Sequence, residues 1–257
     1  MKSPFTKIFI LFAFLGFSAS TVRAIDHSNL DEGRPLRIED PYSIKQRELA
    51  IEAGFGFAAE RRGDDRVFIP MELLYGAFPN FQIGIGTGFS SEPTDEEAKF
   101  GDIHIEALYN FNQETLSIPA LGVKVGISAP TGVDSAGTIL TAKGLVTKSV
   151  GRLSIHGNAA YKFFNGDGEG EEDNRLEFIL GASYPLGAPG YTRVTVIGDV
   201  FTDLSVERDN SNIVGTEFGL RYQLTQRVVL DTGIGSEFAG ASERSPFYAT
   251  AGVSVGF

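Results

Sequence analysis

The chain has 257 residues, of which 42% are hydrophobic, and it carries a formal net charge of -11 with no cysteine. A protein that crosses a membrane with helices needs runs of about 18 or more apolar residues, and the long apolar run of this chain, Ile8 to Phe17, is shorter. The missing cysteines exclude a disulfide framework, and the acidic balance argues against nucleic acid as a partner, because nucleic-acid binding needs a basic surface.

Residues 1–24 have the composition of a secretory signal peptide. Lys2 and Lys7 precede the apolar run, and a Val-x-Ala sequence ends at Ala24. We expect cleavage near Ala24, with an uncleaved anchor as the alternative. Cleavage would take the formal charge from -11 to -14, because the segment contains three basic residues and no acidic ones.

Residues 25–45 are polar and contain Pro35 and Pro41. We interpret them as an extended periplasmic N-terminal lead-in to the domain that follows. A small plug that enters that domain is the alternative.

Residues 46–257 alternate between apolar and polar side chains. In the last stretch, 247–257, every odd position is Phe, Ala or Val, and every even position is Tyr, Thr, Gly or Ser. A period of two places these sets on opposite faces of a β-strand. About twelve such strands are expected, near 46–60, 66–78, 81–90, 101–111, 121–128, 139–149, 152–164, 175–184, 191–202, 213–224, 227–238 and 247–257. The strand near 191–202 is the least regular, because Ile197 and Phe201 fall on its polar face.

The connections between these strands alternate in length. Short turns such as 79–80 and 225–226 alternate with longer polar loops such as 91–99 and 165–174. Short periplasmic turns, long external loops and an even strand count are typical of bacterial outer-membrane barrels. The prediction is an all-β fold, an antiparallel up-and-down transmembrane β-barrel, in the outer membrane of a Gram-negative bacterium. A soluble sandwich or lipocalin-like barrel, with the apolar face inside, is the alternative.

Four segments also resemble a known family. They are Gly33–Asp40, Gly101–Ile103, Val125–Gly132 and Leu153–Phe163. The sequence resembles the outer-membrane proteins described as transporters of the meta-pathway of phenol degradation. The resemblance implies an outer-membrane β-barrel with a transport role, and it supplies no catalytic residues.

If the apolar face contacts lipid, the polar face lines the lumen, since charges are costly in hydrocarbon. The expected lumen-lining residues are Glu52, Glu72, Asp102, His104, Glu106, Lys124, Lys143, His156, Lys162, Glu177, Arg193, Asp199, Glu217, Arg221, Asp231 and Glu237. An aqueous path with an acidic bias would favour cations or neutral polar solutes. A lumen closed by acid–base pairs is equally compatible with twelve strands, because strand number alone does not fix the pore radius.

Three local patterns raise further hypotheses. Asp102, His104 and Glu106 share a strand face and could hold a metal, although a polar lumenal stripe explains them as well. Ser154 and His156 share a face, as a nucleophile and base of a membrane hydrolase would. The loop 165–174 alternates acids and glycines and could hold calcium, or it is simply a solvated acidic loop.

The function we predict is passive passage of small solutes through a polar, acid-leaning lumen. The alternatives are a closed barrel with a structural or adhesive role through acidic external loops, and a membrane hydrolase. We expect no enzymatic activity, cofactor, metal or nucleic acid. The expected partners are outer-membrane lipid, an unidentified small solute, and the barrel-assembly machinery, which would bind the terminal strand ending at Phe257.

Overall fold

The computed structural model of the chain describes residues 26, 28–30, 34–62, 65–91, 98–133, 135, 137–165, 174–188, 191–206, 212–240 and 244–257. The predicted signal peptide lies outside these residues, so cleavage near Ala24 stays a prediction. In this part of the chain, no helix has the length and apolar character needed to cross a bilayer.

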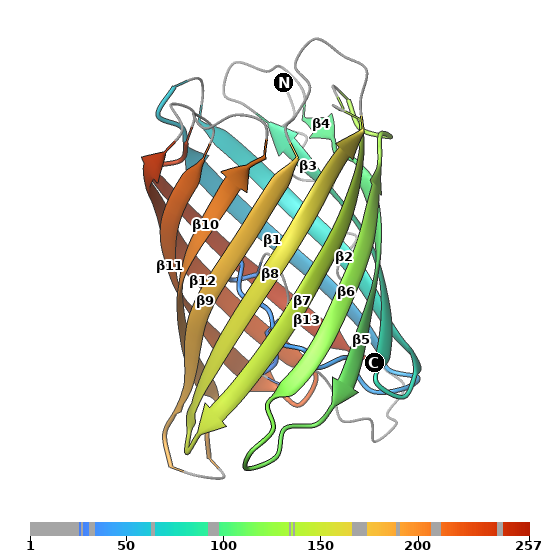
Figure 1. Ribbon diagram of the computed structural model, residues 1–257, viewed down its shortest axis with the longest axis vertical. Coiled ribbons are helices and arrows are strands. Elements are labelled where there is room, and N and C mark those ends of the chain that lie inside the picture. The colour runs from blue at the N-terminus through green and yellow to red at the C-terminus, as the bar shows by residue number, and fades with distance from the viewer. Residues whose placement is uncertain are drawn as a thin grey trace, which may run out of the picture.

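The described residues form one antiparallel sheet that closes on itself (Figure 1). Its strands are β1 (Leu49–Ala59), β2 (Arg66–Phe78), β3 (Phe81–Ser91), β4 (Lys99–Phe100), β5 (Ile103–Asn112), β6 (Ala120–Ala129), β7 (Thr138–Val150), β8 (Leu153–Asn165), β9 (Arg175–Leu186), β10 (Val194–Ser205), β11 (Ile213–Thr225), β12 (Val228–Gly240) and β13 (Phe247–Gly256). The short β4 pairs only with β3, next to the start of β5. The other twelve strands form a closed ring, as the sequence predicts.

The ring closes where the first strand meets the last. β1 pairs with β13 from Ala50–Gly256 to Ala59–Phe247. Beyond these pairs, the Phe257 N–H donates to the Leu49 carbonyl at 2.8 Å, and the Leu49 N–H donates to Phe257 at 3.3 Å. A closed ring leaves no free sheet edge, which is the condition for spanning lipid with strands.

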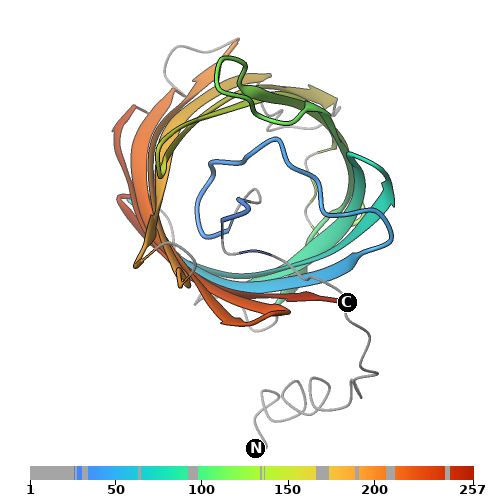
Figure 2. The same ribbon diagram turned by 90° about the horizontal axis from the view of Figure 1, so that it is seen from below.

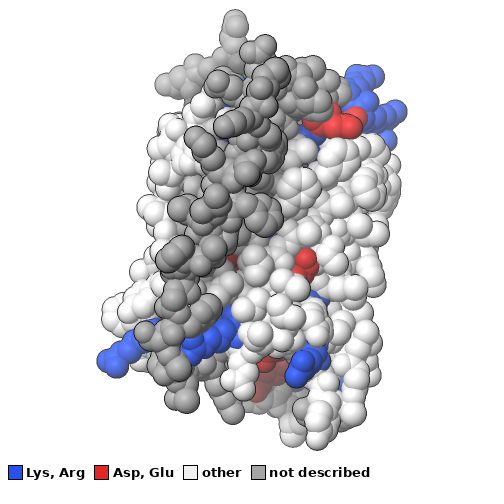
Figure 3. Space-filling model, turned by 180° about the vertical axis from the view of Figure 1, so that it is seen from behind, with Lys and Arg blue, Asp and Glu red and all other residues white. Residues whose placement is uncertain are grey.

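The apolar face of the sheet points outward. Large apolar side chains are exposed along the strands, for example Phe55, Ile105, Leu180 and Phe218. Figure 3 shows uncharged atoms across most of the middle of one side, with Lys and Arg gathered near its two ends. This arrangement rules out the soluble alternative, which would place the apolar face inside.

The two ends of the barrel differ. Connections 79–80, 151–152 and 226–227 are tight turns. They lie at the end of the barrel where β1 begins and β13 ends, which we call the tight-turn end. The connections 113–119 and 187–193 at this end are longer than the tight turns. Between the strands, nearly all of the residues that the structure does not describe belong to the connections at the other end.

Candidate functional site in the barrel lumen

Residues 34–44, here called the lumenal segment, lie inside the barrel. The coil in the centre of the ring in Figure 2 contains this segment, and Leu36, Ile38 and Asp40 are almost completely buried. The finding corrects our expectation of a lead-in outside the barrel and matches the plug that we considered as the alternative. The physical reason is that the segment carries both apolar and charged side chains that match those on the inner wall.

Arg34 fixes the start of the lumenal segment to the seam of the ring. Its guanidinium donates to the Ala53 carbonyl at 2.9 Å and to the Val253 carbonyl at 3.2 Å. It also forms an ion pair with Glu52 and donates to Ser254 Oγ at 3.0 Å. Arg34 therefore binds the first and the last strand at once.

Arg37 lies among three carboxylates from β9, β11 and β12, on the side of the wall that follows β13 in the ring. Its guanidinium nitrogens are 2.8 Å from Glu237 Oε1, 3.3 Å from Glu217 Oε1 and 3.7 Å from Glu177 Oε1. The Arg37 N–H donates to Glu217 Oε2 at 2.5 Å, and the guanidinium carbon lies 4.0 Å from the centre of the Phe201 ring. Burial alone would lower the pKa of Arg37, but the surrounding carboxylates outweigh burial and raise it. Arg37 is therefore a permanent cation here.

Glu39 has the opposite charge and meets a basic part of the wall. Its carboxylate lies 3.0 Å from Lys124 Nζ and 3.6 Å from Lys143 Nζ. Asn158 completes the contact: its amide nitrogen donates to the Glu39 carbonyl at 2.8 Å, and its oxygen accepts the Glu39 N–H at 2.9 Å. Arg34, Arg37 and Glu39 thus each face wall residues of opposite charge.

An apolar cluster lies between these anchors. Leu36 and Ile38 of the segment are buried together with Leu30 and with three inward-facing wall residues, Ile179, Ile197 and Phe201. This contact explains why β10 breaks the alternation expected for a polar lumen. Its apolar inner residues form the surface on which the segment packs.

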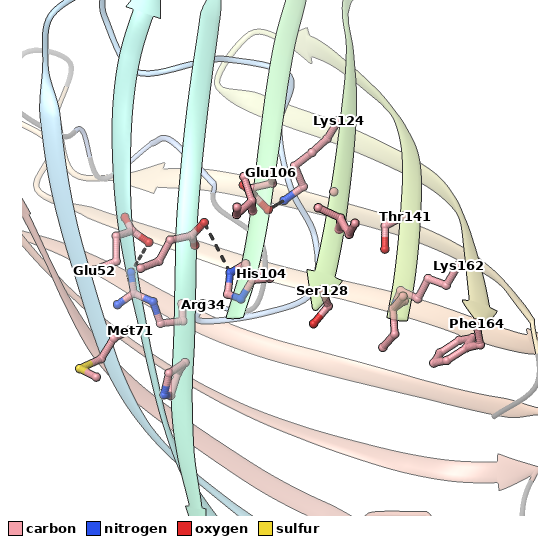
Figure 4. Close-up of a pocket in the computed structure, with 16 residues that line it drawn as sticks. Arg34, Glu52, Met71, His104, Glu106, Lys124, Ser128, Thr141, Lys162 and Phe164 are labelled. Atoms are coloured by element: carbon pink, nitrogen blue, oxygen red, sulfur yellow. Dashed lines mark hydrogen bonds and ion pairs between the residues drawn. The ribbon is translucent and has the colours of Figure 1, made fainter. Parts of the chain in front are cut away.

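A cavity of about 470 Å³ remains beside the segment. Its wall comes mainly from the parts of β2, β5, β6, β7 and β8 nearer the long connections, and Figure 4 shows its polar side chains. Glu106 lies 3.1 Å from Lys124, and His104 Nε2 lies 3.8 Å from Glu72. Glycine makes room for the imidazole, since a Cβ at Gly86 would lie 2.1 Å from His104.

The structure places most of the expected lumen residues inside the barrel. Those buried there are Glu52, Lys124, Lys143, His156, Glu177, Asp199, Glu217, Arg221, Asp231 and Glu237. Those that line the cavity and are partly exposed are Glu72, His104, Glu106 and Lys162.

Two expected lumen residues lie elsewhere. Arg193 precedes β10 and is exposed at the end with the tight turns. Asp102 precedes β5 and accepts hydrogen bonds from the Gly132 N–H and Ser135 Oγ, each at 2.8 Å. The prediction was wrong for both, because β5 begins after Asp102 and β10 begins after Arg193, and the period of two places side chains only within a strand.

The metal hypothesis and the hydrolase hypothesis find no matching geometry in the structure. Among the described residues, no three His, Cys, Asp or Glu side chains gather as metal ligands. Ser154 Oγ is 2.9 Å from Ser149 Oγ, whereas the two ring nitrogens of His156 contact Thr147 at 2.8 Å and Ser183 at 2.9 Å. The nucleophile–base pair of the hydrolase hypothesis is therefore not formed. Calcium binding by the loop 165–174 stays a prediction, because residues 166–173 lie outside the part of the chain that the structure describes.

Sequence reasoning missed the lumenal segment as a source of site residues. Arg34, Arg37 and Glu39 belong to the run we read as a lead-in. The available signal was the irregularity of the strand near 191–202, where Ile197 and Phe201 needed an apolar partner inside the barrel.

These features define an outer-membrane type of β-barrel, with twelve strands and an N-terminal segment folded into its lumen. Residues 33–255 match the family described as "Putative MetA-pathway of phenol degradation", and the chain belongs to this family. The resemblance noted in the sequence is thereby confirmed. No curated protein matches the sequence.

Solved structures share the fold. An outer membrane channel from Pseudomonas putida F1 aligns with a TM-score of 0.68 and 14% identity, over 89% of this chain and 100% of that chain. The NanC porin aligns with a TM-score of 0.56 and 12% identity over 81% and 98% of the two chains. The KdgM porin aligns with a TM-score of 0.55 and 10% identity over 80% and 99%. At these identities, the similarity establishes the architecture.

Proposed function

We propose that this protein is a passive outer-membrane channel for small polar solutes, and that the lumenal segment narrows the path. The observation that carries the proposal is the charged cavity of about 470 Å³ between the segment and the wall. A barrel whose only role was structural would have no need of such a water-accessible polar space. The named channel and porins that share the fold support the same reading.

The charge of the lumen predicts a preference for cations. The interior carboxylates include Glu39, Asp40, Glu52, Glu72, Glu106, Glu177, Asp199, Glu217, Asp231 and Glu237, and the interior Lys and Arg include Arg34, Arg37, Lys124, Lys143, Lys162 and Arg221. Carboxylates outnumber the basic groups, and rings of Asp and Glu favour cations in pores.

Planar bilayer recordings test the proposal. We expect discrete current steps from purified, folded protein in KCl, and a reversal potential in a salt gradient that shows K⁺ moving more readily than Cl⁻. The double variant Glu72→Gln and Glu106→Gln should reduce this preference, because both residues line the cavity.

The matched control is Glu48→Gln, which removes a carboxylate near the tight-turn end, where Glu48 accepts the Lys45 N–H. This variant should keep the reversal potential of the wild type. Silence from correctly folded protein would refute the channel, and a reversal potential that the cavity variants leave unchanged would refute the role of the cavity carboxylates in cation preference.

The remaining expectations also stand as proposals. The terminal strand β13 and Phe257 would be the part bound by the barrel-assembly machinery. The exposed apolar band would contact outer-membrane lipid. We assign no catalytic role to any residue.

A further inference from the structure

The wall of the cavity differs in charge between its two sides. On one side, the carboxylates of Glu72 and Glu106 come from β2 and β5. On the other side, the Thr141 hydroxyl and the Lys162 ammonium come from β7 and β8. Figure 4 shows Thr141 between Glu106 and Lys162. A solute in the cavity therefore meets hydrogen-bond acceptors at one end and donors at the other.

The register of the strands produces this arrangement. One row of directly paired residues crosses the inner wall from β3 to β8: Gly84, Glu106, Gly126, Thr141 and Lys162. Gly126 leaves the floor of the cavity open, since an added Cβ there would meet its nearest neighbour at 3.5 Å. Three strand spacings, about 14 Å along the wall, separate the backbones of Glu106 and Lys162. A short extended molecule can therefore lie over Gly126 between the two side chains.

Each charged end of this row belongs to an ion pair whose other partner is buried. Glu106 lies 3.1 Å from Lys124, and their side chains are 15% and 4% exposed. Lys162 lies 3.0 Å from Glu177, and their side chains are 25% and 3% exposed. The cavity thus meets the carboxylate of one pair and the ammonium of the other. Because both ends are already compensated, a solute that carries both charges complements the cavity better than a single ion does.

The acidic side of the cavity is short of donors. Glu52 lines it too and lies directly opposite Glu72 in the pairing of β1 with β2. Among the described residues, no donor forms a hydrogen bond with Oε1 of Glu52 or with Oε1 of Glu72. Arg34 binds the other oxygen of Glu52, and His104 Nε2 stays 3.8 Å from Glu72 Oε1. Opposed like charges and acceptors without donors are both unfavourable, so an added donor group would stabilise this side.

Glu72 also reaches the row that ends at Lys162. A Cβ at Gly84 would lie 2.6 Å from Glu72 Oε1 and 2.8 Å from Glu106 Cγ, so these two side chains meet above the glycine. An ammonium group beside them could donate up to three hydrogen bonds. The carboxylates of β2 and β5 therefore form one end of a single site.

We propose that the cavity binds zwitterions whose ammonium and carboxylate groups are separated by a short chain, as in ω-amino acids. The ammonium group would lie beside Glu72 and Glu106, and the carboxylate beside Thr141 and Lys162. The cavity of about 470 Å³ falls within the range of small-molecule sites, about 300–1,000 Å³. The inference rests on the proposed channel for its physiological meaning, and it narrows the small polar solutes to this class.

Calorimetric titration of ε-aminocaproate into folded protein in a nonionic detergent tests the site. The amide of ε-aminocaproate lacks the negative charge, and its N-acetyl derivative lacks the positive charge. We expect the wild type to bind ε-aminocaproate at least about tenfold more tightly than either analogue, because each analogue loses one charge-assisted contact. Equal or tighter binding of either analogue, or no binding of ε-aminocaproate, would overturn the proposal.

Two variants should remove the preference in a crossed pattern. Lys162→Gln should abolish the preference over the amide and keep the preference over the N-acetyl derivative. The double variant Glu72→Gln and Glu106→Gln should do the opposite. A variant that weakens all three compounds by the same factor would show a merely structural effect and overturn the proposal. The matched controls are Lys148→Gln and Glu48→Gln at the tight-turn end, and both should keep the wild-type affinities.

Folding of every variant is checked by its heat-modifiable migration in gels. If Lys162→Gln does not fold, the double variant Lys162→Gln and Glu177→Gln, which removes both members of the ion pair, replaces it with the same expected result. The titration requires no transport. The preference for the zwitterion without bilayer current would support the site and refute the channel, whereas current without the preference would support the channel and refute the site.

Discussion

The Glu39 carboxylate lies 3.0 Å from Lys124 Nζ, inside a barrel whose wall strand β6 begins more than seventy residues further along the chain. Both side chains are almost fully shielded from solvent. A buried pair of this kind adds little net stability over an apolar replacement, but removing one partner leaves a buried charge uncompensated. The pair therefore sets where the lumenal segment lies more than how stable the barrel is.

Glu39→Gln should detach the middle of the segment from β6 and β7. Breaking a buried pair costs about 3–5 kcal/mol, and here the segment can move away instead of the barrel unfolding. We expect higher single-channel conductance, measured in planar bilayers, with little change in the unfolding midpoint of the barrel. The control is Arg66→Ala, which breaks the exposed contact with Glu60 at 3.5 Å and should change neither quantity. Equal conductance in Glu39→Gln and wild type would contradict this prediction.

Gly233→Ala should displace the segment without changing any charge. A Cβ at Gly233 would lie 2.6 Å from the Pro35 carbonyl oxygen and 3.0 Å from Leu36 Cδ2. Overpacking of this type costs about 1–3 kcal/mol, so we expect a rise in conductance smaller than that of Glu39→Gln. Gly126→Ala is the control on the inner wall, where an added Cβ meets its nearest neighbour at 3.5 Å. An equal rise in conductance in Gly126→Ala would show that the effect of Gly233→Ala does not come from displacement of the segment.

Leu180→Arg should hinder membrane insertion more than Leu186→Arg. Leu180 lies in the middle of β9 and Leu186 at its end, and both are exposed on the outer face. A lipid-facing arginine costs about 2–4 kcal/mol at the bilayer midplane and about 0–1 kcal/mol near the interface. Denaturant titration of protein folded into vesicles measures the difference. Equal costs at the two positions would contradict the proposed orientation of the wall in lipid.

Glu114, in the turn between β5 and β6, predicts a pH dependence at the tight-turn end. Burial pushes the pKa of Glu114 up, but hydrogen bonds from the Ser149 N–H, Lys148 and the Ser149 hydroxyl outweigh burial and lower it. A lowered pKa means that Glu114 stabilises the fold above its unfolded-state pKa, and that this stabilisation is lost as pH falls through the folded-state pKa.

The variant Glu114→Gln should therefore melt below the wild type at pH 7, and the gap should close at acidic pH. Thermal melts of both proteins across this range check the sign. A gap that widens on acidification would show that the hydrogen bonds to Glu114 do not depend on its charge.

The wall of the barrel was predictable because its information is local. The alternation of side chains within each strand, as in 247–257, indicates which face is apolar. The lengths of the connections indicate which end of the barrel has the short turns. The closed ring then follows from the need to pair every strand edge in lipid. The errors at Asp102 and Arg193 occurred at strand ends, where the alternation continues for a residue or two after the pairing has stopped.

The position of the lumenal segment was much harder to predict, because it depends on contacts between residues that are far apart in the sequence. Pro35 and the charges around it give residues 34–44 the character of an extended linker. Only the distant inner wall, with Ile197 and Phe201 on β10 and lysines on β6 and β7, reveals that the segment has a binding surface. Without knowledge of which strands face each other across the lumen, those complementary groups could not be matched.

Arg34 is bound by carbonyl, carboxylate and hydroxyl oxygens that come from both the opening and the closing strand of the ring. Two of its partners, Val253 and Ser254, are absent until the final residues of the chain have been added to the sheet. The guanidinium therefore connects β1 to β13, and all of its contacts can form only after β13 has paired with β1. Docking of the N-terminus and sealing of the cylinder would then be two aspects of a single event.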